Sequence, residues 1–283
     1  MGRAARTIGF VLAVALTAVG CRGGSAADPT DAERIAYGPA PSQFAELWLP
    51  AGSGPAPVVA MVHGGCWLSR YGLDLMHPLA LDLRRAGIAV WNIEYRRLGE
   101  DGAGYPGTFA DVGQAIDMLR EAARRHPLNL AKVVALGHSA GGHLALWAAA
   151  RRRLPPGSPL ATRDPLPLGG VMTLAGINDL AAYAADGPAC SGAATIGKLS
   201  GTRSYADTSP RALLPIGVPQ VIVSGSRDGI VPPEFGRGYA AAAKAAGDRV
   251  EAVELGGADH FALIDPGSSA WKTLRPLLLE MLR

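Results

Sequence analysis

The stretch that decides the fold is A-L-G-H-S-A-G-G-H, residues 135–143. The apolar run at 132–137 predicts a strand, and the Ala- and Leu-rich segment 140–153 predicts a helix. Ser139 therefore stands in a Gly-X-Ser-X-Gly turn from strand to helix, the setting that holds a serine hydroxyl in a strained, exposed position. A tight turn that carries a serine by chance is the alternative, and the flanking strand and helix argue against it.

Predicted strands alternate with predicted helices on both sides of this turn. We expect an edge strand at 44–50 and further strands at 57–63, 88–95, 132–137, 170–175, 219–225 and 249–255. We expect helices at 73–86, 109–125, 140–153, 234–246 and 269–282. Continuous apolar runs are typical of parallel strands buried on both faces, and the alternation predicts right-handed crossovers. The sequence thus predicts the α/β class, with helices on both faces of a mostly parallel sheet.

Two further expectations concern the start of one helix and one segment without clear periodicity. Thr108 and Asp111 are expected to cap the helix over 109–125. Residues 176–215 are rich in Gly, Pro, Ala and Ser and show poor periodicity. Because this segment lies between two predicted strands, we expect a lid-like insertion over the carboxyl edge of the sheet, where open α/β sheets bind ligands. A long surface loop is the alternative.

A serine hydroxyl is a weak nucleophile unless a base takes its proton. His260 lies in a Gly-rich loop just after the last predicted strand, and Asp228 lies on a turn after the preceding one. Both loops are expected at the same sheet edge as Ser139, and the order Ser, Asp, His fits a catalytic triad. Asp179 and Asp259 are competing acids. Asp259 is adjacent to the histidine and would diverge from its ring, and Asp179 is better placed to anchor the insertion.

An early loop can complete such a site. H-G-G-C-W at 63–67 follows a predicted strand, and its glycines bring bare backbone amides close to the nucleophile. We expect the amides of Gly65, Cys66 and Ala140 to form an oxyanion hole, with Gly64 as a further candidate donor. His63 is expected to hold this loop by a hydrogen bond, because no partner spacing supports a metal site.

Other side chains near these motifs have less defined roles. Trp67 and His138 are candidates for the substrate pocket, and ordinary core packing is the alternative for Trp67. Glu94 and Arg97 are expected to form a buried ion pair that supports the site.

Together the motifs resemble those of the α/β-hydrolase superfamily, of the serine esterase and lipase type. H-G-G-C-W (63–67), E-Y-R-R (94–97), G-H-S-A-G-G-H (137–143), D-G-I-V-P (228–232) and Y-G-P-A-P-S-Q-F (37–44) are similar to motifs of the bifunctional feruloyl/acetyl-xylan esterase-like (BD-FAE-like) and kynurenine formamidase group. The resemblance runs from about residue 37 to the C-terminus. It implies an α/β-hydrolase fold and a carboxylesterase-like enzyme that cleaves small esters through an acyl-enzyme.

The resemblance leaves three alternatives open. They are an N-formyl amide hydrolase of the kynurenine formamidase type, a small peptidase, and an inactive binding protein with the hydrolase fold. The expected partner is a small-molecule ester or amide, and no metal or organic cofactor is expected. The formal net charge of +3 is too small to indicate nucleic-acid binding.

The N-terminus predicts export. A basic start at 1–7 and an apolar stretch at 8–19 fit a signal peptide over 1–20. The following Cys21 resembles the lipidated cysteine of bacterial lipoproteins, and cleavage near Ala26 or Ala27 is the alternative. We expect a flexible tether over 21–36, a hydrolase domain over 37–283, and a secreted or cell-envelope location with membrane contact only through a lipid anchor.

The three cysteines fit this location. If Cys21 carries lipid, Cys66 and Cys190 form an even pair in an oxidising compartment, which favours a disulfide. Two buried free thiols are the alternative. Cys66 also departs from the related sequences, which have Gly, Tyr or Phe there, and a bridge would pin the insertion to the oxyanion loop.

Overall fold

The computed structural model describes residues 1–2, 32–201 and 204–283. The chain divides into a unit over Met1–Asp31 and a unit over Ala32–Arg283. The predicted signal peptide and Cys21 lie outside the described residues. Among the residues that are described, no helix combines the length and the apolar character needed to cross a membrane.

An eight-stranded sheet organises residues 32–283, with the order β1-β2-β4-β3-β5-β6-β7-β8. The strands are β1 (Glu33–Ala36), β2 (Phe44–Trp48), β3 (Ala56–Val62), β4 (Ala89–Ile93), β5 (Leu128–His138), β6 (Gly170–Leu174), β7 (Gln220–Gly225) and β8 (Val250–Leu255). The β1–β2 and β2–β4 pairs are antiparallel, and every other neighbouring pair is parallel. The predicted mostly parallel sheet is confirmed.

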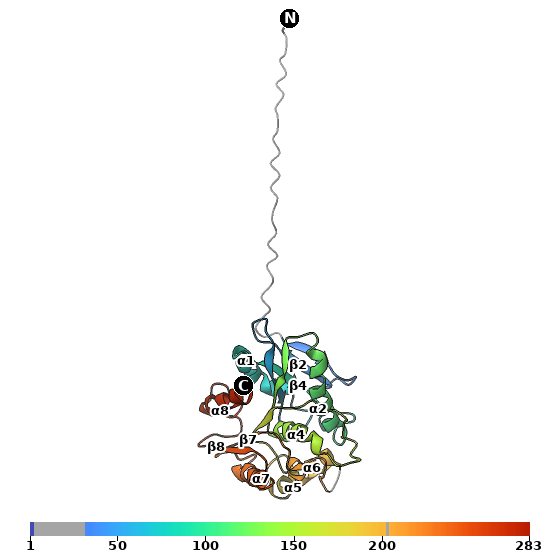
Figure 1. Cartoon of the computed structure of the whole chain (residues 1–283), viewed down its shortest axis with the longest axis vertical. Coiled ribbons are helices and arrows are strands. Elements are labelled where there is room, and N and C mark those ends of the chain that lie inside the picture. The colour runs from blue at the N-terminus through green and yellow to red at the C-terminus, as the bar shows by residue number, and fades with distance from the viewer. Residues whose placement is uncertain (3–31, 202–203) are drawn as a thin grey trace. The chain divides into compact units, whose positions relative to one another are not determined.

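Helices cover both faces of the sheet. They are α1 (His77–Arg85), α2 (Gly107–Asp117), α3 (Leu119–Ala122), α4 (Ala140–Ala149), α5 (Leu180–Asp186), α6 (Gly192–Ser200), α7 (Pro233–Ala245) and α8 (Ser269–Met281), with short 3-10 helices η1 (Leu73–Met76), η2 (Arg151–Arg153) and η3 (Pro210–Leu213). In Figure 1, α1 and α8 lie on one side of the sheet and α2 and α4 on the other. The Trp271 indole N–H joins α8 to α1 by donating to Asp82 at 2.9 Å.

The burial of the strands follows their place in the sheet. Strands β4, β6 and β7 are buried along their whole length, and β3 is buried except for Pro57. Their apolar runs are explained by helices on both faces, which leave no side of these strands in water. Strand β8 is only partly buried, as expected at the edge of a sheet.

Two expectations at the residue level are wrong. Residues 33–36 form β1 instead of belonging to the tether, so β2 is not an edge strand. This strand buries only Ile35 among its four residues, which is too weak a pattern to distinguish from a linker. The predicted capping pair does not cap α2, since no side chain caps that helix. The Thr108 hydroxyl and the Asp111 carboxylate bond Arg96 instead.

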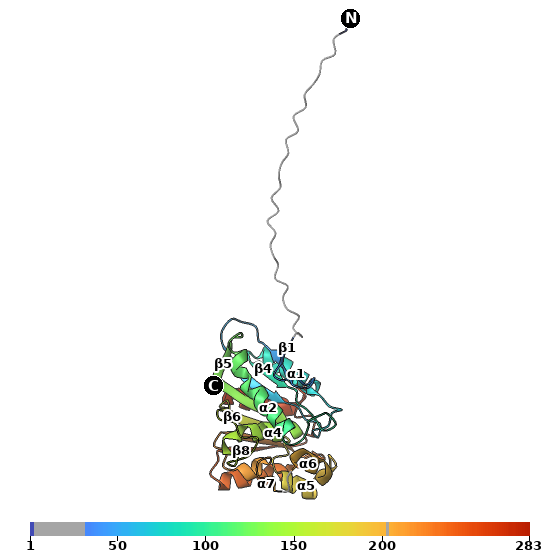
Figure 2. The same ribbon diagram turned by 90° about the vertical axis from the view of Figure 1, so that its right-hand side faces the viewer.

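The insertion over 176–215 contains helices, namely α5, α6 and η3. Asp179 begins α5 by accepting hydrogen bonds from the amides of Ala181 and Ala182 at 3.0 and 3.2 Å. The two helices pack side by side (Figure 2). The insertion follows the carboxyl end of β6, and a disulfide joins it to the loop after β3, so it lies at the carboxyl edge of the sheet.

Candidate active site

The turn between β5 and α4 holds Ser139 in an unusual backbone conformation. Ser139 has φ 54° and ψ −121°, a region that costs a non-glycine residue about 1–3 kcal/mol. Its amide donates to the carbonyl of Leu174 at 2.9 Å, which fixes the turn against β6. The neighbouring glycines are required by space, because a Cβ on Gly137 would lie 2.1 Å from the Gly141 carbonyl oxygen. The chain therefore turns as a nucleophile elbow does.

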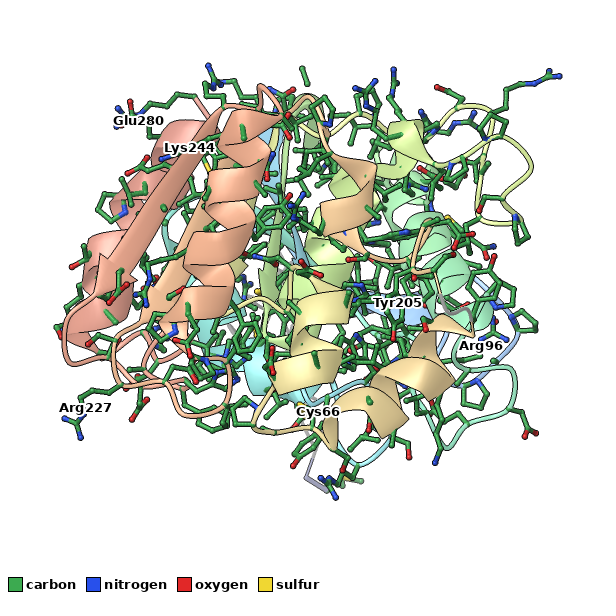
Figure 3. All side chains as sticks on the ribbon, turned by 90° about the horizontal axis from the view of Figure 1, so that it is seen from below. Cys66, Arg96, Tyr205, Arg227, Lys244 and Glu280 are labelled. Carbon is green, nitrogen blue, oxygen red and sulfur yellow. A yellow bond between two sulfur atoms is a disulfide. The ribbon has the colours of Figure 1, made fainter. Side chains whose placement is uncertain are left out.

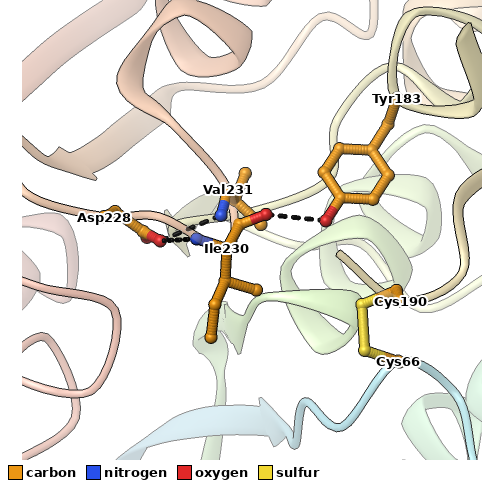
Figure 4. Close-up of a disulfide and its surroundings, with 6 residues drawn as sticks. All are labelled: Cys66, Tyr183, Cys190, Asp228, Ile230 and Val231. Carbon is orange, nitrogen blue, oxygen red and sulfur yellow. Dashed lines mark hydrogen bonds between the residues drawn. A yellow bond between two sulfur atoms is a disulfide. The ribbon is translucent and has the colours of Figure 1, made fainter. Parts of the chain in front are cut away.

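The acid and the base lie together as expected. His260 Nδ1 donates to Asp228 Oδ2 at 2.7 Å, and the pair is buried. The other carboxylate oxygen of Asp228 accepts from the amides of Ile230 and Val231 at 2.8 and 2.9 Å (Figure 4). Burial would raise the pKa of Asp228, but the hydrogen bond and charge of His260 and these two amides hold it below its usual value. Asp228 is thus ionised at neutral pH and fixes the His260 tautomer, leaving Nε2 free to accept a proton.

The structure brings His260 close to the elbow without a direct bond to the serine. Among the described residues, no hydrogen bond joins the Ser139 hydroxyl to His260. His260 instead contacts His138, the residue before Ser139. The rings of His138 and His260 are 4.4 Å apart between centroids, and His138 Nε2 donates to the His260 carbonyl at 3.0 Å. Catalytic hydrogen bonds are often long in a site without substrate and tighten when substrate binds.

The two candidates for the substrate pocket are buried, which corrects that expectation. His138 is 2% exposed and uses its ring to hold the backbone of His260. Burial, with the charge of His260, lowers the pKa of His138 to about 3, so its ring is neutral. Trp67 is fully buried and packs edge-on against the ring of His143, with 5.4 Å between centroids. Its indole belongs to the core, the alternative that the sequence left open.

The loop after β3 lies directly against the nucleophile. A Cβ on Gly64 would lie 2.9 Å from the His138 carbonyl oxygen and 3.1 Å from the Ser139 Cβ, so a side chain there would push the loop away from the serine. Gly65 and Cys66 have positive φ angles of 104° and 54°. Within the part of the chain that the structure describes, the amides of Gly65, Cys66 and Ala140 donate no hydrogen bond to another group. Three unpaired amides beside a serine are suited to binding an oxyanion.

Glu94 contacts the loop after β3 and also pairs with Arg97. Glu94 Oε2 lies 3.3 Å from Arg97 Nη1, which is the expected buried ion pair. His63 contacts the same carboxylate at 2.8 Å, as a residue that holds the loop should. In the described residues, no group of three or more His, Cys, Asp or Glu side chains could hold a metal ion.

The insertion is attached to the site at two points. A disulfide joins Cys66, in the loop after β3, to Cys190, between α5 and α6, across 124 residues of sequence (Figure 3 and Figure 4). The Tyr183 hydroxyl of α5 donates to the Ile230 carbonyl at 2.7 Å, next to the amides that bind Asp228. Sequence analysis missed Tyr183, since nothing around a tyrosine in a poorly periodic segment indicates its partner.

Sequence analysis also missed two exposed aromatic side chains. Phe261 is 57% exposed and its ring stands edge-on to His260 at 5.3 Å. Tyr71 is 36% exposed and lies over Gly65, where a Cβ would approach the Tyr71 Cβ to 2.4 Å. Phe261 could have been identified from its position directly after His260. Both rings are exposed next to residues of the candidate site.

Comparison with known proteins agrees with this fold. The family model named BD-FAE matches residues 46–240. The search of curated proteins finds no match to the chain. Among solved structures, the thermophilic esterase Est2 of the Planctomycetes species Thermogutta terrifontis is 24% identical, with a TM-score of 0.73 over 90% of this chain and 92% of that chain.

Two further solved structures give the same result. Thermogutta terrifontis esterase 2 phosphonylated by sarin is 23% identical, with a TM-score of 0.75 over 90% of this chain and 95% of its own. Esterase B from Lactobacillus rhamnosis is 20% identical, with a TM-score of 0.76 over 89% of this chain and 84% of its own. At such identities the likeness establishes the fold. Since the family model covers more than half of the sequence, the chain belongs to the BD-FAE family, and it adopts the α/β-hydrolase fold.

Proposed function

We propose that this protein is a serine hydrolase of the carboxylesterase type, with Ser139 as nucleophile, His260 as general base and acid, and Asp228 as the residue that orients His260. The observation that carries the proposal is the 2.7 Å bond between Asp228 and His260 at the sheet edge that also holds the strained Ser139 turn. Membership of the BD-FAE family supports esters as substrates.

The geometry supports a two-step acyl transfer. His260 Nε2 takes the proton of the Ser139 hydroxyl while the serine oxygen bonds the ester carbonyl carbon. The amides of Gly65, Cys66 and Ala140 stabilise the resulting oxyanion, and each such donor is worth about 3–4 kcal/mol in related chemistry. The carbon–oxygen bond to the alcohol then breaks, and His260 gives its proton to that alcohol. Water, activated by His260, releases the acid from the acyl-serine.

One relative of the same fold has been solved with short carboxylates bound. Est2 of Thermogutta terrifontis has been solved with propionate and with butyrate bound, and in forms modified by sarin, tabun and paraoxon. We extend this to a preference of the present protein for small acyl esters and to reactivity toward organophosphorus reagents. Parallel assays with acetyl, feruloyl, N-formyl and aminoacyl substrates separate this proposal from amide and peptide hydrolysis.

Replacement of the nucleophile tests the proposed function. Ser139→Ala removes the attacking oxygen, so turnover of p-nitrophenyl acetate should fall by about 10⁴-fold or more. A fluorophosphonate probe should label the wild-type protein and not the variant. Turnover by Ser139→Ala within severalfold of wild type, or equal labelling of both proteins, would show that Ser139 is not the nucleophile.

We also propose that the protein is exported. The proposal rests on the signal-like sequence at 1–20, and the disulfide between Cys66 and Cys190 supports it, because such bridges persist in oxidising compartments. Fractionation of the producing cell, with mass spectrometry of the mature N-terminus, would test the cleavage site and the lipidation of Cys21. Finding the protein in the cytoplasm with residues 1–20 still attached would contradict the proposal.

A further inference from the structure

His63 makes two hydrogen bonds that together define its protonation. It is fully buried, and its Nδ1 lies 2.8 Å from the carbonyl oxygen of Gly64. Its Nε2 lies 2.8 Å from Oε1 of Glu94. A carbonyl oxygen can only accept a hydrogen bond, so Nδ1 must carry a proton.

Glu94 determines the state of the second nitrogen. Its carboxylate is buried and also accepts from the amides of Leu73 and Tyr95 at 3.1 and 3.0 Å, with Arg97 at 3.3 Å. Burial would raise the pKa of Glu94, but His63, Arg97 and the Tyr95 amide outweigh it and hold the pKa below its usual value. An ionised carboxylate accepts and does not donate, so Nε2 of His63 carries a proton as well. The hydrogen-bond geometry, in which two backbone amides and Arg97 also face the carboxylate, thus assigns a proton to each ring nitrogen of His63.

The ring of His63 contacts the carbonyl end of a peptide unit, and the other end of that unit is the Gly65 N–H, a proposed oxyanion donor. The Gly64 carbonyl and the Gly65 amide belong to the same planar peptide unit and point in opposite directions. The bond from His63 to the carbonyl oxygen therefore fixes the plane of that unit and draws electron density away from the Gly65 N–H. Gly64 itself lies against Ser139, where a Cβ would be 3.1 Å from the serine Cβ.

We propose that the Glu94–His63 pair positions and polarises the Gly64–Gly65 peptide so that the Gly65 N–H is a stronger oxyanion donor. Glu94 and His63 are positioning residues in this scheme, because they act through the peptide and touch no reacting atom. The inference rests on the proposed function, since it assigns a task to the oxyanion hole of the proposed reaction.

Aromatic packing keeps the pair in place. The Tyr95 ring stacks on His63 at 4.4 Å with an interplanar angle of 14°, and its hydroxyl donates to the His63 carbonyl at 3.0 Å. The Tyr37 hydroxyl donates to the Glu94 carbonyl at 2.7 Å. Tyr37 thus holds the backbone of Glu94 without touching its charge, which makes it a control for a purely structural role.

The experiment compares Glu94→Gln with Tyr37→Phe. The glutamine keeps the size of the side chain and can donate its amide N–H to a bare Nε2 of His63, but it removes the negative charge that holds a proton on that nitrogen. For p-nitrophenyl acetate, kcat of Glu94→Gln should fall roughly tenfold or more while KM changes less than about threefold, because the lost stabilisation is confined to the oxyanion. Tyr37→Phe should keep kcat within about twofold of wild type.

A spectroscopic measurement reads the charge without using activity. In protein labelled with ¹⁵N-histidine, both ring nitrogens of His63 should carry protons in the wild type at the pH of the activity assay, and one should be bare in Glu94→Gln. The His63 signals are assigned by their loss in His63→Gln. A singly protonated His63 in the wild type overturns the inference even if Glu94→Gln does not fold.

The outcomes separate this inference from the proposed function. If fluorophosphonate labels Ser139 and the kcat values of Glu94→Gln and Tyr37→Phe are equal, the role of the pair is overturned and the hydrolase remains. If the wild-type protein has neither labelling at Ser139 nor esterase activity, both proposals are overturned. A selective loss of kcat in Glu94→Gln together with two protons on His63 supports the inference.

Discussion

At the scale of single residues, the site depends on the absence of side chains at two glycines. Gly64 lets the oxyanion loop approach Ser139, and Gly141 lets α4 start directly under β3. A Cβ on Gly141 would lie 2.2 Å from the Val62 carbonyl oxygen and 2.3 Å from that of His63. These are backbone atoms, so they cannot move aside without shifting the strand that leads into the oxyanion loop.

This contact gives a prediction for Gly141→Ala. The clash should lower the free energy of unfolding by about 1–3 kcal/mol or more, since overpacking against backbone forces the elements apart. The matched control is Gly238→Ala in α7, where nothing lies within 4 Å of the added Cβ. That change should raise stability by about 0.5–1 kcal/mol, because alanine is the better helix former. Urea unfolding of both variants checks the opposite signs, and equal effects would contradict the steric account.

At the scale of elements, the insertion joins parts of the site that come from different strands. The Cys66–Cys190 bridge attaches it to the loop after β3, and Tyr183 attaches it to the loop after β7. The bridge closes a loop of 124 residues, for which the chain-entropy model gives about 4–5 kcal/mol. A single hydrogen bond is worth about 1 kcal/mol, so the covalent link should be the stronger of the two.

We predict a large difference between loss of the bridge and loss of the tyrosine bond. The double variant Cys66→Ser with Cys190→Ser should lose about 4 kcal/mol in free energy of unfolding, while Tyr183→Phe should lose about 1 kcal/mol. Chemical denaturation without reductant measures both. A double variant as stable as wild type would mean that the bridge does not constrain the unfolded chain.

The same elements show what the sequence could predict. Strands β3, β4, β6 and β7 and the second half of β5 are buried, so their apolar runs were unambiguous. The residues that follow β5, β7 and β8 led directly to Ser139, Asp228 and His260. Strand β1 and the insertion helices are short and bury few residues, so packing with distant segments decides them. The roles of Trp67 and His138 could not be predicted from the sequence either, because burial of a ring depends on partners far along the chain.

At the scale of the whole molecule, two buried histidines link stability to pH. Burial lowers the pKa of His143 to about 4 and, with the charge of His260, that of His138 to about 3. In the unfolded chain both have the usual pKa of about 6.5. Below pH 6.5 both histidines are protonated in the unfolded chain but stay neutral in the folded protein, so acid favours unfolding. His77, whose pKa is raised by its hydrogen bond to Glu46, acts in the opposite direction but only above pH 6.5.

We therefore predict that the free energy of unfolding falls as pH drops from 6.5 toward 4. The two histidines together should give a slope of up to roughly 3 kcal/mol per pH unit, corresponding to two protons. The depressed pKa values of Glu94, Glu100 and Asp228 add to the loss below about pH 4.5, as these carboxylates become protonated. Denaturant titrations between pH 4 and 8 measure the slope, and His143→Gln should remove about one proton from it. A flat profile over this range would refute the assignment of neutral buried rings.

The disulfide also determines whether the chain stays in one covalent piece after proteolysis. A protease that cuts one peptide bond between Cys66 and Cys190 produces two pieces that remain a single covalent molecule. Exposed connections such as residues 155–159 and 161–164 fall within that interval, so a nick there separates nothing until a thiol reagent opens the bridge. A cut between Cys190 and Asp228 would instead free the piece that carries Asp228 and His260, which non-covalent contacts alone would then hold in the sheet.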